Sequence, residues 1–203
     1  MRHTIRASAV ALALAVPLAG AADTALSLRT GWAIPMGDAV SGVGLNEWWD
    51  GFVPVQLDLD FGVSERARLG VYAQYGFASA VCNQQIDCSG RSIRAGVQAI
   101  WALGEGSFAP WLGAGAGFEQ MRYEQTTPNY YVPGGADITQ GFDLNGWELN
   151  LQGGAAWTLS KRVKLGPYLL LAAGRYEGGD ISAYADKSIH AWAHVGVRCS
   201  FGL

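Results

Sequence analysis

Apolar and polar residues alternate along most of the chain with a period of two. Between residues 147 and 152 the odd positions are apolar and the even positions are polar: Trp147, Leu149 and Leu151 against Glu148, Asn150 and Gln152. A strand places successive side chains on opposite faces, so this alternation predicts β-strands with one apolar face. The pattern recurs in eight segments, at residues 25–35, 52–61, 67–77, 92–103, 109–121, 146–159, 163–176 and 189–201.

The connections between these segments are alternately long and short. They span residues 36–51, 62–66, 78–91, 104–108, 122–145, 160–162 and 177–188. Short turns on one rim and long loops on the other are typical of bacterial outer-membrane barrels. The segment lengths suit this class, because a tilted membrane-spanning strand needs about 9–11 residues. An even number of strands predicts that both ends of the barrel lie on the short-turn, periplasmic side.

The apolar face is typical of a surface that contacts lipid. It carries aromatic residues near the strand ends, at Trp32, Tyr75, Phe77, Trp101, Trp147, Trp157 and Phe201. Ten residues separate Trp147 from Trp157, about 33 Å of strand and about 25 Å of height at a tilt of about 40°. A soluble barrel such as a lipocalin also alternates. However, the polar face is rich in glycine, which suits a narrow lumen and is costly on a solvated strand.

Charged residues of both signs lie on the polar face. Four basic and four acidic positions are predicted to point into the lumen: Arg29, Arg68, Arg94, Arg198, Asp58, Asp60, Glu119 and Glu148. Side chains fill the interior of an eight-stranded barrel, so these groups must pair with one another or with trapped water. The sequence therefore predicts a plugged polar lumen with a charge network and no wide pore.

The first 22 residues have the features of a secretory signal peptide. Arg2 and Arg6 precede the apolar run AVALALAVPLAG, and small residues follow it before Asp23. We expect residues 1–22 to be the signal peptide and residues 23–203 to be the barrel domain. Without Arg2 and Arg6 the chain has 12 basic and 17 acidic residues, a net charge of −5. We therefore expect no nucleic-acid partner.

The cysteines and histidines predict one disulfide and no metal site. Cys82 and Cys88 flank the polar stretch NQQID, and an oxidising compartment favours a disulfide between them. The alternative at these cysteines, metal binding, lacks a histidine or second cysteine pair nearby in the sequence. His190 and His194 are about 13 Å apart along one strand, too far to share an ion by themselves. We expect no cofactor.

With these features the chain resembles the small bacterial outer-membrane β-barrel proteins of the OmpA and OmpX type, over its whole length after the signal peptide. The segment GVRCSF, residues 196–201, is similar to the terminal signal that the barrel-insertion machinery reads in that family, although Gly202 and Leu203 follow it. The resemblance implies an all-β, eight-stranded antiparallel up-and-down transmembrane β-barrel. It also implies location in the cell outer membrane, in contact with outer-membrane lipid and lipopolysaccharide.

Aromatic side chains in the long loops are the candidate contact residues. They are Trp48, Trp49, Tyr130 and Tyr131. Exposed aromatic clusters suit a surface partner or a small hydrophobic ligand, although they also serve to pack one loop against another. We expect a non-enzymatic protein with a structural or surface-interaction role through its extracellular loops. The alternative is binding or passage of a small hydrophobic molecule.

A lipid-modifying enzyme is the least favoured function. Small outer-membrane barrels of that kind modify lipopolysaccharide with serine and histidine groups, and here Ser188 and His190 lie two residues apart on one face of a strand. Their order does not match the His-x-Ser order of the deacylases. An activated nucleophile also needs a base within hydrogen-bond reach, and we expect no catalytic residues in this chain.

Overall fold

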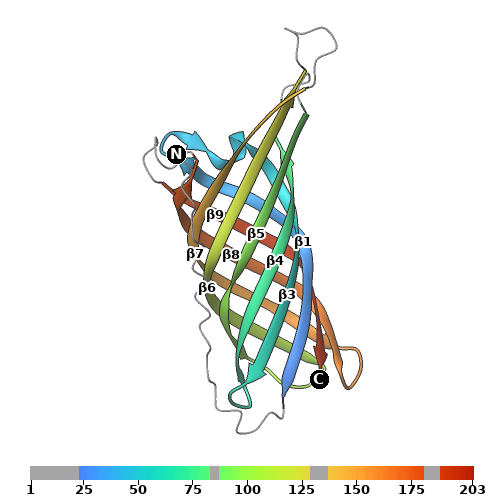
Figure 1. The fold of residues 1–203 in the computed structure, drawn as a ribbon. Helices are drawn as coiled ribbons and strands as arrows, with labels where there is room; N and C mark the ends of the chain where they lie inside the picture. Colours follow the sequence, from blue (N-terminus) through green and yellow to red (C-terminus); the bar gives the residue numbers. More distant parts are fainter. Residues whose placement is uncertain (1–22, 83–86, 129–136, 181–187) are drawn as a thin grey trace.

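The alternating segments fold into a ring of eight long antiparallel strands (Figure 1). The structure, a computed structural model, describes residues 23–82, 87–128, 137–180 and 188–203. A short strand, β2, and a 3-10 helix, η1, lie between the first two long strands. The elements are β1 (Thr24–Val40), β2 (Val43–Gly44), η1 (Leu45–Glu47), β3 (Trp49–Gly62), β4 (Ala67–Ala80), β5 (Asp87–Ala102), β6 (Phe108–Thr127), β7 (Ile138–Thr158), β8 (Val163–Gly179) and β9 (Ile189–Gly202).

The ring is closed by pairing between the first and last strands. Each long strand pairs with the next in chain order, and β1 pairs with β9 from Ala25 opposite Gly202 to Gly37 opposite His190. A closed ring has no sheet edge, so its strands satisfy their backbone hydrogen bonds within the barrel, as lipid requires. The prediction of an eight-stranded antiparallel barrel is therefore confirmed.

The two rims of the barrel differ as predicted. The connections at one rim, residues 63–66, 103–107 and 159–162, are short, and the backbone N–H of Leu203 donates to the carbonyl of Thr24 at the same rim. We call this rim the short-turn end and the opposite rim the long-loop end. No helix within the described ranges is long and apolar enough to span a membrane. The predicted signal peptide lies outside the described residues.

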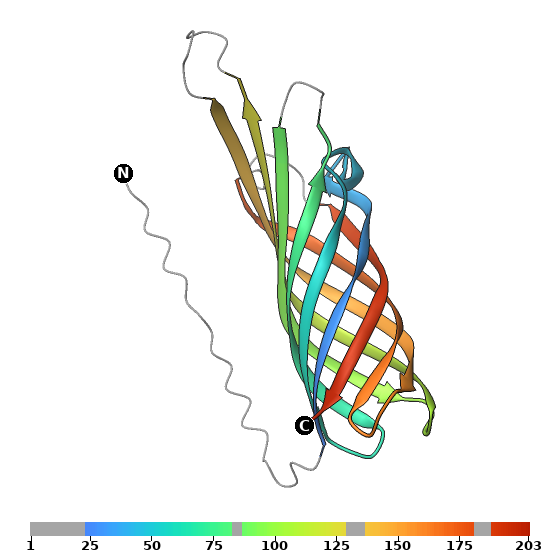
Figure 2. The ribbon, with the colours of Figure 1, turned by 90° about the vertical axis from the view of Figure 1, so that its right-hand side faces the viewer.

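At the long-loop end the strands continue further than the alternation predicted. The β6–β7 hairpin reaches Thr127 and Ile138 and projects beyond the rest of the ring (Figure 2). The range 36–51, predicted as a loop, contains the end of β1, all of β2 and η1, and the start of β3. Backbone pairing sustains these strands even where apolar and polar residues no longer alternate strictly. The alternation alone therefore underestimates the length of the strands at this end.

The two faces of each strand separate as the pattern predicted. Leu151 on β7 is 68% exposed, whereas its neighbour Gln152 is 5% exposed and faces the lumen. Glycine on the inner face makes room for large side chains. A Cβ atom at Gly117 would collide with the hydroxyl of Tyr72, and one at Gly154 would collide with the ring of Trp111. The inward glycines thus allow a narrow barrel to hold bulky groups.

Arginine in the middle of the outer face should destabilise the barrel in a bilayer. We expect Leu151→Arg to cost about 2–4 kcal/mol of folding free energy, because the charge must enter the hydrocarbon core. The matched control is Leu159→Arg, at a similarly exposed residue just beyond the end of β7, which should cost about 0–1 kcal/mol near the interface. Urea titration in lipid vesicles measures both, and equal costs would contradict the assignment of the lipid-facing belt.

Candidate functional site

The interior of the barrel is divided into three zones along its axis. Charged and polar side chains fill the middle, apolar and aromatic side chains fill the long-loop end, and a cavity lies at the short-turn end. Alternate residues of every strand face the lumen, so each zone combines side chains from strands that are far apart in the sequence.

Two Arg–Asp pairs lie in the part of the middle zone nearest the short-turn end. Nε of Arg29 on β1 donates to Oδ2 of Asp58 on β3 at 2.6 Å. Nη2 of Arg198 on β9 donates to Oδ2 of Asp60 on β3 at 2.7 Å. The side chains of Arg29 and both aspartates are fully buried, and that of Arg198 is 11% exposed. The two pairs bring equal numbers of positive and negative charges together.

Glutamine side chains connect these two pairs. Nε2 of Gln98 donates to Oδ1 of Asp60 at 2.8 Å, and Oε1 of Gln98 accepts from Arg29 at 3.2 Å. Gln152 accepts a further hydrogen bond from Arg29 and donates to Gln98 at 3.0 Å. A buried charge is tolerated only when its neighbours satisfy its hydrogen-bonding capacity. Gln98, which contacts both pairs, therefore makes them one connected group.

A second ionic group lies around Arg94 on β5. Its Nε and Nη2 atoms are 2.6 and 2.5 Å from Oε2 of Glu148 on β7. The hydroxyl of Tyr72 donates to the other oxygen of Glu148 at 2.7 Å. Nη1 of Arg94 lies 3.3 Å from Oε1 of Gln74 and 2.9 Å from Nε2 of His194. Charge-assisted contacts of this kind are stronger than those between neutral groups.

A third contact pairs a histidine with Glu119, one of the predicted lumen acids. Nε2 of His190 lies 2.8 Å from Oε2 of Glu119, and both side chains are 1% exposed. The ring of His190 stacks on Tyr176 with centroids 3.9 Å apart. We call these three groups together the ionic network: Arg29, Arg94, Arg198, Asp58, Asp60, Glu119, Glu148 and His190.

Arg68 is a correction to the predicted network. It pairs with Asp23 near the start of β1, and its side chain is 29% exposed. Arg68 is the second residue of β4, so it lies at the short-turn rim, where Asp23 is available. The other seven predicted members belong to the ionic network. Sequence reasoning missed His190 and His194, although both occupy the inward parity of their strand, because histidine was considered only as a catalytic or metal-binding group.

Apolar side chains close the long-loop end of the interior. Trp49, Phe52 and Trp192 are completely buried, and the rings of Phe52 and Trp192 have centroids 4.8 Å apart. Trp48, Tyr123 and Phe142 pack around them and are partly buried. We call this group the aromatic cluster: Trp48, Trp49, Phe52, Tyr123, Phe142 and Trp192.

The four predicted contact residues of the loops differ in their surroundings. Trp49 is buried in the aromatic cluster, so it is not the exposed contact that the sequence suggested. Trp48 is half-buried, with its ring centroid 5.0 Å from that of Phe142. Tyr130 and Tyr131 lie outside the described residues. Trp48 is the remaining described candidate for contact with a ligand from outside.

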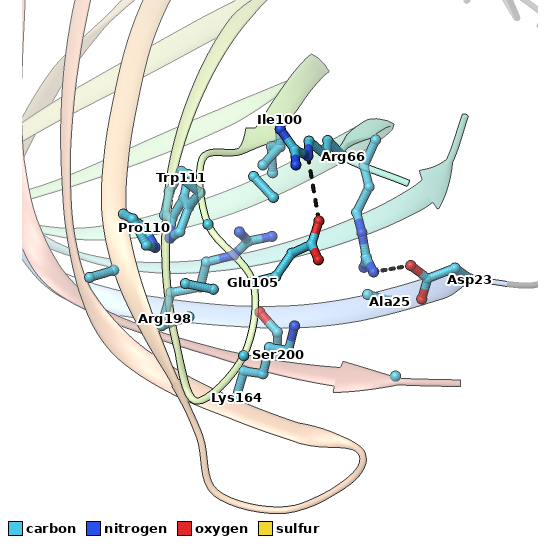
Figure 3. Close-up of a pocket in the computed structure, with 18 of the residues that line it drawn as sticks. Asp23, Ala25, Arg66, Ile100, Glu105, Pro110, Trp111, Lys164, Arg198 and Ser200 are labelled. Atoms are coloured by element: carbon cyan, nitrogen blue, oxygen red, sulfur yellow. Dashed lines mark hydrogen bonds and ion pairs between the residues drawn. The ribbon is translucent and has the colours of Figure 1, made fainter. Parts of the chain in front are cut away.

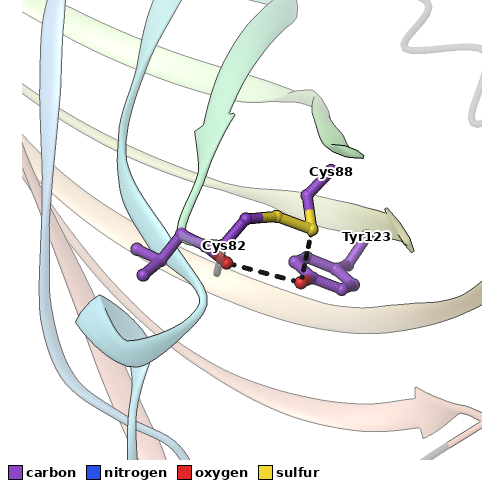
Figure 4. Close-up of a disulfide and its surroundings, with 4 residues drawn as sticks. Cys82, Cys88 and Tyr123 are labelled. Carbon is purple, nitrogen blue, oxygen red and sulfur yellow. Dashed lines mark hydrogen bonds between the residues drawn. A yellow bond between two sulfur atoms is a disulfide. The ribbon is translucent and has the colours of Figure 1, made fainter. Parts of the chain in front are cut away.

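A disulfide links Cys82 to Cys88 beside this cluster (Figure 4). The two Cα atoms are 6.1 Å apart, within the usual range for such bonds. Sγ of Cys88 also lies 3.1 Å from the hydroxyl of Tyr123. The predicted pairing therefore has compatible geometry in the fold. It ties the end of β4 to the start of β5 at the long-loop end.

A cavity of about 370 Å³ opens at the short-turn end. Figure 3 shows it between the strand ends and the short turns. We call it the vestibule, and its walls include Arg68, Ile100, Trp111, Lys164, Arg198 and Ser200. Arg198 belongs to both the vestibule and the ionic network, so the network forms the inner boundary of the cavity.

The described residues provide neither a nucleophile–base pair at Ser188 nor a metal cluster. Nε2 of His190 contacts Glu119, and its Nδ1 has no hydrogen-bond partner within the described ranges. Ser188 therefore has no contact with the base that would activate it. Within the same ranges no group of three potential metal ligands comes together.

Residues 54–193 match the family model described as the autotransporter beta-domain. The match covers more than two thirds of the sequence. The chain belongs to the autotransporter beta-domain family. Comparison with curated protein sequences finds no match.

Solved structures of other outer-membrane proteins share this fold. Neisserial surface protein A superposes with a TM-score of 0.59 at 10% identity, covering 88% of this chain and 96% of the other. A major outer membrane protein from Thermus thermophilus gives a TM-score of 0.55 at 11% identity, covering 89% and 99%. The family, the fold and the exposed apolar belt all indicate an outer-membrane protein. The protein is an outer-membrane β-barrel with its short turns on the periplasmic side.

Removing one charge from the ionic network should strongly destabilise the protein. Glu148→Gln keeps the shape of the side chain but leaves Arg94 buried without its counter-charge, which should cost about 3–5 kcal/mol. The matched control is Glu105→Gln, because Glu105 pairs with Arg66 across an exposed contact of 3.5 Å. Breaking that pair should cost at most about 1 kcal/mol. Urea unfolding in vesicles compares them, and similar midpoints would contradict the structural importance of the network.

Proposed function

We propose that the protein is a non-enzymatic outer-membrane barrel with a plugged lumen, which stabilises the membrane and interacts with surface partners through its extracellular end. The observation that carries this proposal is the filling of the interior. The ionic network occupies the middle, and the aromatic cluster occupies the extracellular end. Two successive layers of different chemistry support a barrel that is closed to solutes.

The ionic network opposes opening for an energetic reason. Separating Arg29 from Asp58, or Arg94 from Glu148, would leave buried charges without their closest counter-charges. The name of the family refers to transport of a polypeptide through the barrel. A polypeptide that passed through this lumen would have to separate these ion pairs. We therefore propose a permanent plug in the barrel and locate its function at the rims.

The plugged lumen predicts negligible ion conductance. In planar bilayers the wild-type protein should add no steady conductance above that of a protein-free bilayer. A variant that combines Arg29→Ala, Asp58→Ala and Trp49→Ala removes parts of both barriers without changing the net charge, and it should conduct ions. The control pair Arg66→Ala with Glu105→Ala also conserves net charge but lies on the exposed surface. It should remain closed.

The outcome that contradicts the plug is a steady conductance step in the wild-type protein. A heat-modifiability gel shows in parallel that each variant is folded. If the triple variant is folded and remains closed, closure comes from elsewhere in the barrel and the proposed barriers are wrong.

Binding of a small hydrophobic molecule at the extracellular end is the second candidate function. It is favoured by Trp48 and Phe142, which are only partly buried at the open side of the aromatic cluster. If these rings bind a ligand, Trp48→Ala should weaken binding of a hydrophobic fluorescent probe by about tenfold, because tryptophan anchors contribute strongly in pockets. The matched control is Trp147→Ala, which removes a 48% exposed ring from the lipid-facing belt. Equal probe binding by wild type and Trp48→Ala would exclude this candidate.

A further inference from the structure

The vestibule is a concave site that the plugged-barrel function does not use. Its volume of about 370 Å³ lies within the range of about 300–1,000 Å³ found for small-molecule sites. It opens toward the periplasm, and Arg198 of the ionic network forms part of its inner boundary. A molecule that enters from the periplasm therefore meets a closed end.

Positive charge predominates around the vestibule. Six basic residues and three acidic residues line it, a surplus of three positive charges: Arg66, Arg68, Lys161, Arg162, Lys164 and Arg198 against Asp23, Glu65 and Glu105. This balance is the reverse of the sequence as a whole, which is net negative. A concave surface with charges of one sign concentrates small ions of the opposite sign.

The acidic residues of the vestibule are mostly engaged already. Asp23 pairs with Arg68. Glu105 of the β5–β6 turn pairs with Arg66 of the β3–β4 turn, as Figure 3 shows. In contrast, no described carboxylate lies within 4 Å of the three cations at the β7–β8 turn and the start of β8: Lys161, Arg162 and Lys164. These cations have no protein counter-charge in the described chain, so they are available to an anionic ligand.

The inner wall of the vestibule combines a fixed cation with apolar surface. The guanidinium of Arg198 lies 4.9 Å from the ring centroid of Trp111, and its Nη2 is held by Asp60 at 2.7 Å. Ile100 is also part of the lining. Because these groups are buried and held by neighbours, this wall is formed before a ligand arrives. Preorganisation of this kind reduces the cost of binding.

We propose that the vestibule binds the phosphate group of a small phosphate ester from the periplasmic side. Arg198 is already paired with Asp60, so the unbalanced positive charge lies on the turn cations Lys161, Arg162 and Lys164. A cluster of cations suits an anion that carries more than one charge, and a monocarboxylate would leave most of this charge unbalanced. Arginine side chains match phosphate oxygens with two parallel hydrogen bonds, and lysine adds a point charge. The apolar surface of Trp111 and Ile100 gives room for the organic part of the ester.

Calorimetric titration of the folded protein in maltoside micelles tests this site, because that detergent contains no phosphate. Glycerol 3-phosphate should give saturable binding, and lactate, a monocarboxylate of similar size, should not. Lys164→Gln should weaken the binding by about tenfold, since a charged hydrogen bond is lost. The matched control is Arg91→Gln, which removes the same charge from the start of β5 at the extracellular end and should leave affinity unchanged.

Two arms distinguish the source of the phosphate. Binding of glycerol 3-phosphate in lipid-free micelles supports a soluble ester. Displacement of that ester by phosphatidylglycerol in the wild-type protein shows that a lipid headgroup reaches the same cations. The proposal is overturned if neither probe binds saturably, if lactate binds as well as the phosphate, or if Arg91→Gln weakens binding as much as Lys164→Gln. A heat-modifiability gel verifies that both variants are folded, so a loss of binding is attributable to the site.

Discussion

The requirement that backbone groups be hydrogen-bonded inside lipid determines the rest of this structure. No water is available there to bond a free N–H or C=O, so the sheet must close, and β1 pairs with β9 along thirteen positions from Ala25 to Gly37. Closure with eight strands makes the lumen narrow. The inward side chains must then fill the interior and satisfy one another, because they are removed from bulk water.

The three interior zones follow from this narrow lumen. Charges at mid-height are buried, so they occur as hydrogen-bonded pairs such as Arg29 with Asp58 and Arg94 with Glu148. Toward the long-loop end the inward positions hold aromatic rings. Toward the periplasm the strands end, and a cavity lies between the strand ends and the short turns. One barrel thus has an extracellular half filled with aromatic side chains and a cavity lined mainly by basic residues at its periplasmic end.

Histidine and arginine positions show the limits of sequence reasoning about the lumen. Seven of the predicted charges belong to the buried network of the structure, since parity along a strand decides which face a residue occupies. The alternation could not assign partners. Arg68 pairs with Asp23 at the rim, and His190 contacts Glu119. Which side chains become partners depends on the stagger of the strands around the barrel. His190 and Glu119, for example, are 71 positions apart in the sequence.

The sequence by itself determined the strand number, the inside and outside faces, and the outer-membrane class, because period-two alternation and loop length are local properties. Only the tertiary structure decided that Trp49 is buried, that the β6–β7 strands extend to Thr127 and Ile138, and that unpaired cations gather around the vestibule. Each of these depends on which strands lie side by side and with what register. The physical reason is that ring closure brings segments together that are far apart in the sequence. A local residue pattern carries no information about such contacts.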